Sequence, residues 1–244
     1  AMVQAGRFIV GTDRNVGKTV LSAALVALLR ERGVQATMMT PVETGGMVED
    51  AYELLERIGL QEPRRLVTPI RYETLASPYV ASLIERKPVD LGLIESAFQE
   101  QVRMGKFVIV EGAGARVPLA KGVFMLDLIR RLGLPTLIVA RSGRGTLNHC
   151  LLTLEALQGA DIPVEGFLLN GFGQYGEGFA EAMNPEVLEE LSGLPVLAVV
   201  EWRPQYQRDL WALIRDMARQ PRLGAYLDEL AASIVSSWRM EKGG

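Results

Sequence analysis

Cysteine and histidine are almost absent from this sequence, which has one of each in 244 residues. The single cysteine, Cys150, excludes an intrachain disulfide and a cysteine-based metal cluster. It follows the single histidine, His149, inside an apolar stretch that is typical of a helix. We therefore expect a buried, inert thiol and a histidine with a structural or hydrogen-bonding role, not a nucleophile with its base.

Long apolar runs and a large excess of charge are missing as well. No run of eighteen apolar residues is present, so no segment is expected to span a membrane, and no signal-peptide pattern is visible. The net charge of −3 argues against a broad nucleic-acid-binding surface. Without repeats or an obvious linker, residues 1–244 are expected to form one domain of a cytoplasmic protein with no membrane or nucleic-acid partner.

Short apolar runs alternate with helical patterns along the chain. Two runs, 107–110 and 136–139, are apolar at almost every position, which is typical of parallel strands covered on both faces. The alternation predicts a doubly wound α/β fold with a mostly parallel sheet, helices on both faces and right-handed crossovers. We expect strands at 7–11, 35–40, 107–111, 136–140, 164–170 and 196–200, and helices at 17–32, 49–58, 77–86, 91–104, 124–132, 146–158 and 186–191.

A last helix is expected at 223–240. It places five large apolar or aromatic side chains at helical spacing: Tyr226, Leu227, Leu230, Ile234 and Trp238. Because its polar face has too few lysines and arginines for a membrane surface, we expect the apolar face to pack on the body of the protein or on a partner subunit.

The most informative segment is Gly-Thr-Asp-Arg-Asn-Val-Gly-Lys-Thr at 11–19, which follows an apolar run and opens a helical pattern. Strand, glycine-containing turn, Lys-Thr and helix form the context of a phosphate-binding P-loop. Backbone N–H groups of the turn face the phosphates, Lys18 reaches the β- and γ-phosphates, and the Thr19 hydroxyl ligates Mg²⁺. Five residues separate Gly11 from Gly17 instead of the usual four, so Thr12 takes the first-glycine position.

Polar and glycine-rich segments follow the expected strands at 40–46, 111–119, 142–148 and 170–171. Loops that converge beside a P-loop predict a cleft for a nucleotide and a second substrate. Glu111 ends a strand otherwise built for burial, so its carboxylate needs a partner, either a Mg²⁺ shared with Thr19 or an arginine. Asp50 either completes the metal shell or is a solvated residue at a helix start.

These motifs together resemble dethiobiotin synthetase, the ATP-dependent carboxylase of biotin synthesis. The resemblance runs in register from the phosphate loop to about Asn170. Its specific parts are residues 11–19, Pro-Val-x-Thr-Gly at 41–45, Ser77-Pro78, Val-Glu-Gly-Ala-Gly at 110–114 with Pro118-Leu119, and Gly-Thr-Leu-Asn-His at 145–149 followed by Leu-Leu-Thr at 151–153.

The resemblance implies a P-loop NTPase-like fold and a defined reaction. Members of the family join CO₂ to the two vicinal amines of 7,8-diaminononanoate, with ATP as co-substrate, Mg²⁺ as cofactor and no biotin prosthetic group. One amine forms a carbamate, ATP phosphorylates it, and the second amine closes the ureido ring and releases phosphate. In the family a second subunit completes the substrate pocket, so a homodimer is implied.

The resemblance also implies which residues form the site. The implied catalytic residues are Lys18, Thr12, Thr44 and Thr40, the last at the position of a family lysine. The implied nucleotide-binding residues are Asp13, Asn15, Val16, Gly17, Lys18, Thr19, Val20 and the adenine-contacting Asn170. The implied substrate-binding residues are Thr12, Thr44, Gly145, Thr146, Leu147 and Asn148. The implied metal ligands are Thr19, Asp50 and Glu111.

Thr40 is the main departure from the family pattern. The family lysine steadies the carbamate and the transferring phosphate, and a threonine cannot supply its charge. Removing one such donor typically costs about 10²–10³ in rate. Thr40→Lys is therefore expected to raise turnover, unless another cation such as Arg116 reaches the same space. A second departure, Glu201-Trp202-Arg203, replaces an Ile-Pro-like pair where the family reads the base, so adenine preference is a weaker expectation than phosphate binding.

Three alternatives remain open at this point. An amidase-type ligase of the same superfamily would carry a glutaminase domain with a catalytic cysteine, which this chain lacks. A MinD-like nucleotide-switch ATPase would carry an additional lysine early in the P-loop, where Arg14 and Asn15 stand here. A catalytically impaired homologue that still binds nucleotide and substrate is favoured by Thr40.

Overall fold

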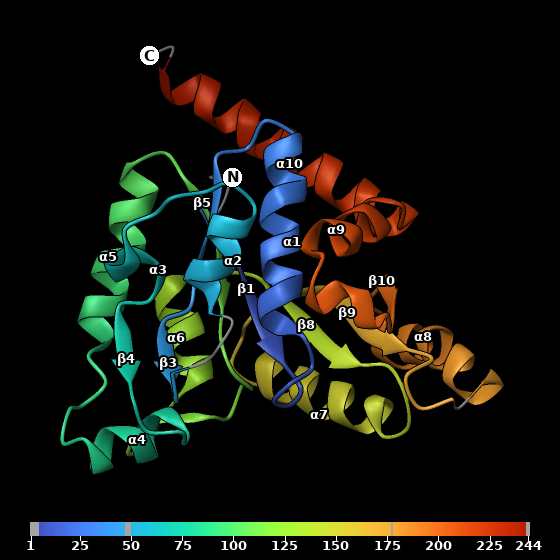
Figure 1. Ribbon diagram of the computed structural model, residues 1–244, viewed down its shortest axis with the longest axis horizontal. Coiled ribbons are helices and arrows are strands. Elements are labelled where there is room, and N and C mark those ends of the chain that lie inside the picture. Colours follow the sequence, from blue (N-terminus) through green and yellow to red (C-terminus); the bar gives the residue numbers. More distant parts are fainter. Residues whose placement is uncertain (1–4, 47–49, 177, 243–244) are drawn as a thin grey trace.

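The computed structural model describes residues 5–46, 50–176 and 178–242. Its central element is a six-stranded parallel sheet (Figure 1). The strand order is β10-β9-β8-β1-β5-β2. The bounds are β1 Gly6–Gly11, β2 Ala36–Met39, β5 Phe107–Glu111, β8 Thr136–Arg141, β9 Val164–Phe172 and β10 Val196–Glu201. All six expected strands are present, and every neighbouring pair is parallel.

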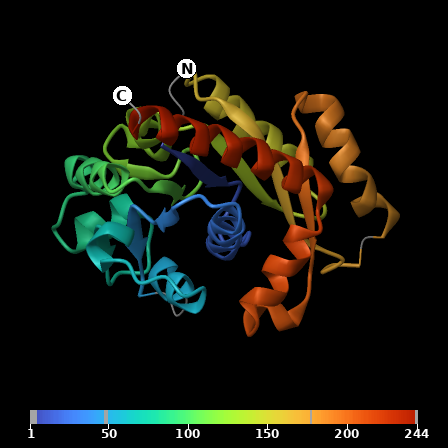
Figure 2. The same ribbon diagram turned by 90° about the horizontal axis from the view of Figure 1, so that it is seen from above.

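Helices cover both faces of this sheet, as the apolar strands require. One face carries α1 (Lys18–Glu31), α2 (Ala51–Arg57), α9 (Leu210–Ala218) and α10 (Pro221–Lys242), whose buried side chains share one core. The other face carries α5 (Leu91–Arg103), α6 (Met125–Leu132), α7 (Thr146–Gln158) and α8 (Phe179–Ser192), which share a second core. In the view from above, α1 and α9 lie on one side and α7 and α8 on the other (Figure 2). The predicted doubly wound α/β fold is confirmed.

The last helix, α10, packs its apolar face on the body of the protein. Leu227, Leu230 and Ile234 are buried in the same core as α1, and Trp238 packs against it. The Tyr226 hydroxyl donates a 2.5 Å hydrogen bond to Glu165, which also accepts from Arg7 Nε at 2.8 Å. Of the two expected arrangements, packing on the body of the protein or on a partner subunit, the structure shows the first. Within the described part of the chain, no helix has the length and apolarity needed to cross a membrane.

Several short elements were not predicted. Two parallel strands, β3 (Val42–Thr44) and β4 (Ile70–Tyr72), form a separate ladder, and β6 (Pro118–Ala120) pairs antiparallel with β7 (Val123–Phe124). The short helices α3 (Arg64–Val67) and η1 (Pro204–Gln207), and the longer α9, were also missed. Strands of two or three residues are too short to show a period of two, so the sequence carries no signal for them.

Two predicted helix boundaries differ from the structure. Helix α8 begins at Phe179 instead of residue 186, and Pro185 lies inside it. The expected start at residue 49 lies outside the described residues, and α2 begins at Ala51. The remaining expected helix, 77–86, is α4, Pro78–Ile84.

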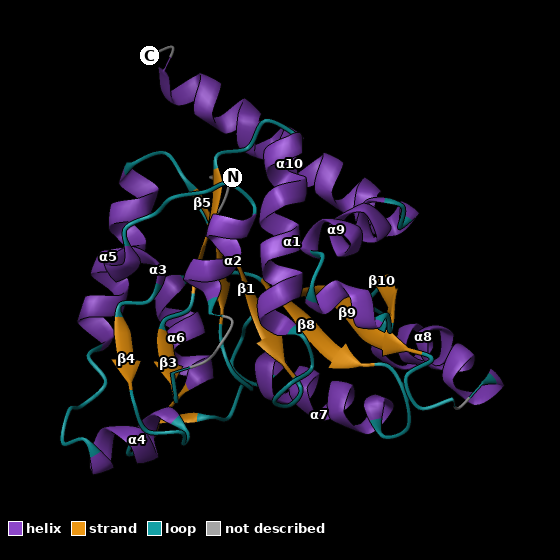
Figure 3. Cartoon of the chain, in the orientation of Figure 1, coloured by secondary structure: helices purple, strands orange, loops and turns teal. Residues whose placement is uncertain are grey.

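Figure 3 shows the sheet's strands running toward the same edge, where loops connect them to the covering helices. The phosphate loop follows β1, Thr40 follows β2, Glu111 ends β5 and Asn170 lies near the end of β9. Because parallel strands place their carboxyl ends at one edge, these four positions, far apart in sequence, meet there.

Candidate nucleotide and substrate site

The phosphate loop between β1 and α1 is shaped by two glycines. A Cβ atom at Gly11 would lie 2.5 Å from Cδ of Lys18, so only glycine leaves room for the lysine stem. Gly17 has φ +91°, and a Cβ there would lie 2.1 Å from Nδ2 of Asn170. Asn170 donates a 3.0 Å hydrogen bond from that nitrogen to the Val16 carbonyl. The loop is thus packed directly against the end of β9.

Lys18 begins α1 and is held against the loop. Its Nζ donates a 2.9 Å hydrogen bond to the Asp13 carbonyl oxygen. Burial lowers the pKa of Lys18, while the nearby carboxylates of Glu111 and Asp13 act in the opposite direction. Lys18 is thus the first residue of α1, with its ammonium group folded back onto the phosphate loop.

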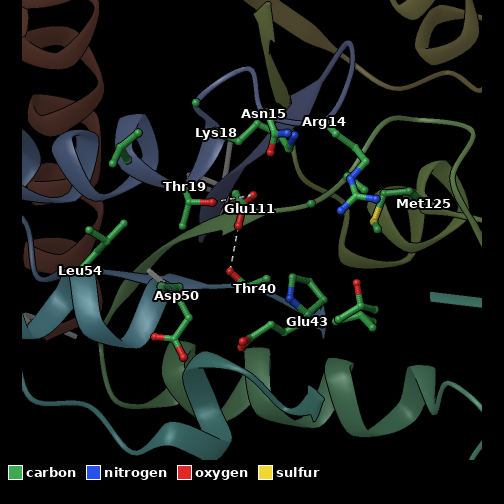
Figure 4. Close-up of a pocket in the computed structure, with 18 of the residues that line it drawn as sticks. Arg14, Asn15, Lys18, Thr19, Thr40, Glu43, Asp50, Leu54, Glu111 and Met125 are labelled. Atoms are coloured by element: carbon green, nitrogen blue, oxygen red, sulfur yellow. Dashed lines mark hydrogen bonds between the residues drawn. The ribbon is translucent and has the colours of Figure 1, made fainter. Parts of the chain in front are cut away.

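Glu111 accepts hydrogen bonds from two threonines at the bottom of the cleft (Figure 4). Thr40 Oγ1 donates to Oε2 at 2.9 Å, and Thr19 Oγ1 donates to Oε1 at 3.3 Å. Only 7% of Glu111 is exposed, and burial raises the pKa of its carboxyl group, against the effect of Lys18. An arginine, the alternative to Mg²⁺ as a partner for this carboxylate, is not among the described contacts of Glu111.

The oxygen atoms of Thr19 and Glu111 fit a Mg²⁺ ion. A buried carboxylate beside a hydroxyl supplies the hard oxygen ligands that this ion prefers. Among the described residues, no group of three or more acidic, histidine or cysteine side chains could hold a metal alone. A Mg²⁺ ion at Thr19 and Glu111 would complete its shell with nucleotide phosphates and water.

Asp50 is less free than Glu111 to bind a metal. Its Oδ1 accepts a 2.8 Å hydrogen bond from the Glu53 backbone and caps α2, and its Oδ2 pairs with Arg64 at 2.7 Å. Arg64 in turn lies over the Tyr52 ring, 4.2 Å from its centroid. The residue is a helix cap, as the alternative interpretation expected, but it is buried, not solvated.

The first of two pockets lies beyond the phosphate end of the loop and has a volume of about 720 Å³. Its walls include Thr40, Thr44, Glu111 and Asp50, together with the buried Glu43. The two carboxylate oxygens of Glu43 accept no hydrogen bond, and its ion-pair partner Arg71 is 3.5 Å away. Burial raises the pKa of Glu43.

The second pocket, of about 520 Å³, lies on the other side of the loop. Asn170 and the segment 201–204 line it, with the Arg203 guanidinium 2.7 Å from Glu201. The two pockets share five lining residues, namely Arg14, Asn15, Gly17, Val20 and Gln207. The two pockets therefore adjoin along the phosphate loop.

The structure brings most of the implied site residues together. The first pocket is lined by Lys18, Thr19, Thr40, Thr44, Asp50 and Glu111. The second pocket is lined by Thr12, Asp13, Val16 and Asn170. Asn15, Gly17 and Val20 line both. Thr12 therefore lies on the nucleotide side of the loop, not among the residues facing Thr40.

The implied carboxylate-binding residues line neither pocket within this chain. Gly145 caps the start of α7, and Asn148 is exposed in its first turn. The side chain of Thr146 is buried, with its hydroxyl 3.6 Å from Sγ of Cys150. Burial raises the pKa of that thiol to about 11, in line with the expected inert cysteine.

Two charged residues of the first pocket, Glu43 and Arg14, were not predicted from the sequence as site residues. Glu43 lies in β3, between residues that the resemblance did single out, and its burial depends on a two-stranded ladder too short to predict. Arg14 was noted only as a departure from a switch-ATPase loop. Arg116, suggested as a replacement cation, lines neither pocket and stacks over Phe124, 4.8 Å from the ring centroid.

The phosphate loop at the carboxyl edge of a parallel sheet, with a lysine, a hydroxyl and a buried acid around it, defines a P-loop nucleotide-binding protein. Residues 6–209 match the family model described as an AAA domain. A solved MinD cell division protein of Aquifex aeolicus has a TM-score of 0.51 over 98% of both chains at 14% identity. A ParA family ATPase from Chlorobium tepidum has a TM-score of 0.54 over 93% of this chain and 98% of its own, at 12% identity. At such identities the likeness shows the fold alone.

Curated relatives identify the family within this class. The ATP-dependent dethiobiotin synthetase BioD of Thermodesulfovibrio yellowstonii is 36% identical over 222 residues, covering 85% of this chain and 92% of the relative. The protein of the same name from Haloferax mediterranei is 41% identical over 189 residues, covering 77% and 80%. The one from Methanocaldococcus jannaschii is 33% identical, covering 85% and 99%. The chain belongs to the ATP-dependent dethiobiotin synthetase family, whose members are ligases of biotin synthesis.

Proposed function

We propose that this protein carboxylates 7,8-diaminononanoate with CO₂ and closes the ring to dethiobiotin, converting ATP to ADP and phosphate. The observation that carries the proposal is the pair of pockets that meet along one phosphate loop. One pocket suits a base and the other a small polar substrate beside the γ-phosphate. The family relationship supports the same reaction.

The reaction proceeds in three balanced steps. One substrate amine adds to CO₂ and loses a proton, which gives a carbamate. A carbamate oxygen then attacks the γ-phosphorus as the bond to the bridging oxygen of ADP breaks, which gives a carbamic-phosphoric anhydride. The second amine attacks the carbonyl carbon and loses a proton, the bond from that carbon to the phosphate oxygen breaks, and phosphate leaves as the ring closes.

The chain's own residues supply positioning and charge for these steps, which is most of what phosphoryl transfer requires. Lys18 holds the β- and γ-phosphate oxygens, and the N–H groups of residues 12–17 surround the phosphates. Thr44 and Thr40 face the carbamate side of the first pocket. Asn170 lines the base pocket and holds the loop through the Val16 carbonyl.

Thr19 and Glu111 would hold Mg²⁺, which neutralises charge that develops between the β- and γ-phosphates. Asp50 joins that shell only by releasing Arg64, its present ion-pair partner. We propose that Gly145, Thr146, Leu147 and Asn148 bind the substrate carboxylate in a homodimer, where a second subunit completes the site, and that the enzyme acts in the cytoplasm without a biotin prosthetic group.

The test is formation of dethiobiotin from 7,8-diaminononanoate, bicarbonate and Mg-ATP, followed by mass spectrometry and by release of phosphate. We expect one phosphate for each dethiobiotin, and no product when the diamine is omitted or when Lys18→Ala replaces the native chain. If only Thr40→Lys forms product, the native chain has the fold for this reaction but lacks the positive charge that the reaction requires. No product from either chain, despite ATP binding, would contradict the proposal and favour a nucleotide-switch protein.

A further inference from the structure

The first pocket is lined by three buried acidic side chains. Glu111, Glu43 and Asp50 all line it, and each is more than nine-tenths buried. A carbamate and a γ-phosphate would add further negative charge to the same space. Transfer between these two anions requires positive charge on both sides of the transferring phosphoryl group.

Lys18 supplies that charge from the nucleotide side. Its ammonium group is already bonded to the Asp13 carbonyl within the loop. The opposite wall contains Thr40, the residue after β2. Its hydroxyl donates a hydrogen bond to Glu111. A hydroxyl already donating to a carboxylate contributes no positive charge to the substrate.

Arg14 is the other positively charged residue that lines this pocket. Its backbone is fixed by a 2.7 Å hydrogen bond from its N–H to Oδ1 of Asp13, while its guanidinium has no hydrogen bond or ion pair with any described residue. Figure 4 shows the side chain extending away from the phosphate loop into the pocket, toward Met125.

Other arginines near the pocket are already engaged. Arg64 pairs with Asp50 at 2.7 Å, and Arg71 pairs with Glu43 at 3.5 Å. Arg116 stacks over Phe124 and lines neither pocket. Each of them would have to abandon its partner to reach a substrate, whereas Arg14 would not.

We propose that Arg14, reaching in from the phosphate loop, is the catalytic cation that binds the carbamate and the transferring phosphoryl group in place of a lysine at position 40. Its guanidinium presents planar paired donors that match carboxylate-like and phosphate oxygens. The inference rests on the proposed function for the identity of the carbamate, but the contact with the transferring phosphoryl group does not depend on it. Arg14 then supplies the positive charge that Thr40 lacks, so the threonine does not indicate a loss of activity.

The experiment compares Arg14→Ala, Arg14→Gln and Arg14→Lys with the native chain, with Arg116→Ala as the matched arginine control. We expect Arg14→Ala and Arg14→Gln to lower kcat by about 10²–10³. Arg14→Lys should retain only part of the rate, because an ammonium group keeps the charge but lacks the paired planar donors. The Kd for Mg-ADP should stay nearly unchanged, since ADP lacks the phosphoryl group that Arg14 is proposed to bind. The thermal midpoint should also stay nearly unchanged, since no described contact of the fold is lost. Thr40→Lys should restore at least tenfold in the Arg14→Ala background and add little to the native chain.

A second measurement separates this inference from the proposed function. Mg-ADP with aluminium fluoride imitates the transferring phosphoryl group and needs no diamine, so we expect Arg14→Ala to weaken its trapping at least tenfold with Mg-ADP affinity unchanged. If the native chain makes no dethiobiotin but trapping depends on Arg14, the proposed function fails and the inference holds. If dethiobiotin forms and both kcat and trapping stay within threefold in Arg14→Ala, the inference is overturned while the proposed function stands.

Discussion

Thr40 and Glu111, seventy-one positions apart in sequence, are joined by a 2.9 Å hydrogen bond at the carboxyl edge of the sheet. The contact is possible because β2 and β5 are parallel neighbours, so the residue after one strand reaches the last residue of the other. A lysine at this position would bring a second positive charge beside Glu111. The threonine instead satisfies one carboxylate oxygen, and Thr19 satisfies the other.

Removal of this hydroxyl is the first prediction. Thr40→Val leaves a buried carboxylate oxygen without its donor, so the free energy of unfolding should fall by about 1–3 kcal/mol. Thr40→Ser keeps the donor and serves as the control, with a loss well below that of the valine variant. Urea denaturation monitored by circular dichroism measures both. Equal stability of Thr40→Val and the native chain would show that the bond contributes nothing.

Asn170 provides the second prediction, because it both holds the phosphate loop and lines the base pocket. Asn170→Ala should weaken ATP binding about tenfold, equivalent to roughly 1.4 kcal/mol, since one tethering bond to Val16 and one pocket contact are lost. Asn184 also donates to a backbone carbonyl, that of Gly143 at 3.3 Å, but lines neither pocket. Isothermal titration should find Asn184→Ala close to the native affinity. Equal losses in both variants would contradict a specific role for Asn170.

The buried Glu43 carboxyl predicts a pH dependence of stability. Burial raises the pKa of Glu43, Asp50 adds to the rise, and Arg71 opposes it. Because the folded state then binds the proton more tightly than the unfolded state, this contribution is full below the unfolded pKa of about 4.3 and is lost as pH rises through the folded pKa. The free energy of unfolding of the ligand-free protein should therefore fall with rising pH less steeply in Glu43→Gln than in the native chain.

Glu100 offers a control of the opposite sign. Its hydrogen bond from Arg65 lowers the pKa of the Glu100 carboxyl, so its contribution is present at neutral pH and lost as pH falls through the folded pKa. Between pH 5 and pH 8, the free energy of unfolding of Glu100→Gln should fall by the same amount as that of the native chain, or by slightly more. A pH profile of Glu43→Gln that is parallel to the native profile would mean that Glu43 titrates normally.

The fold and the phosphate loop could be predicted from the sequence because both are local patterns. The fully apolar strands and the Gly-Lys-Thr turn specify a parallel sheet and the start of α1 without reference to distant residues. Glu111 could be predicted as well, since an acid that ends a buried strand requires a partner. The contact with Thr40 follows from the strand order, which the sequence does not state.

Other features of the site depend on contacts between elements that have no sequence pattern. The pairing of Asp50 with Arg64 requires α2 and α3 to pack together, and α3 has only four residues. The burial of Glu43 requires the short β3–β4 ladder. The direction of the Arg14 side chain is a matter of rotamer and available space, which only the folded loop defines.

The most direct test of the central claim follows an oxygen atom from the carbon source. In single turnovers faster than the exchange of bicarbonate oxygen with water, ¹⁸O-labelled bicarbonate and unlabelled Mg-ATP are supplied with 7,8-diaminononanoate, and the released phosphate is analysed by mass spectrometry. If the carbamate oxygen attacks the γ-phosphorus and leaves with it, each phosphate formed with dethiobiotin carries one ¹⁸O. Dethiobiotin formed together with unlabelled phosphate would contradict phosphorylation of the carbamate by this site.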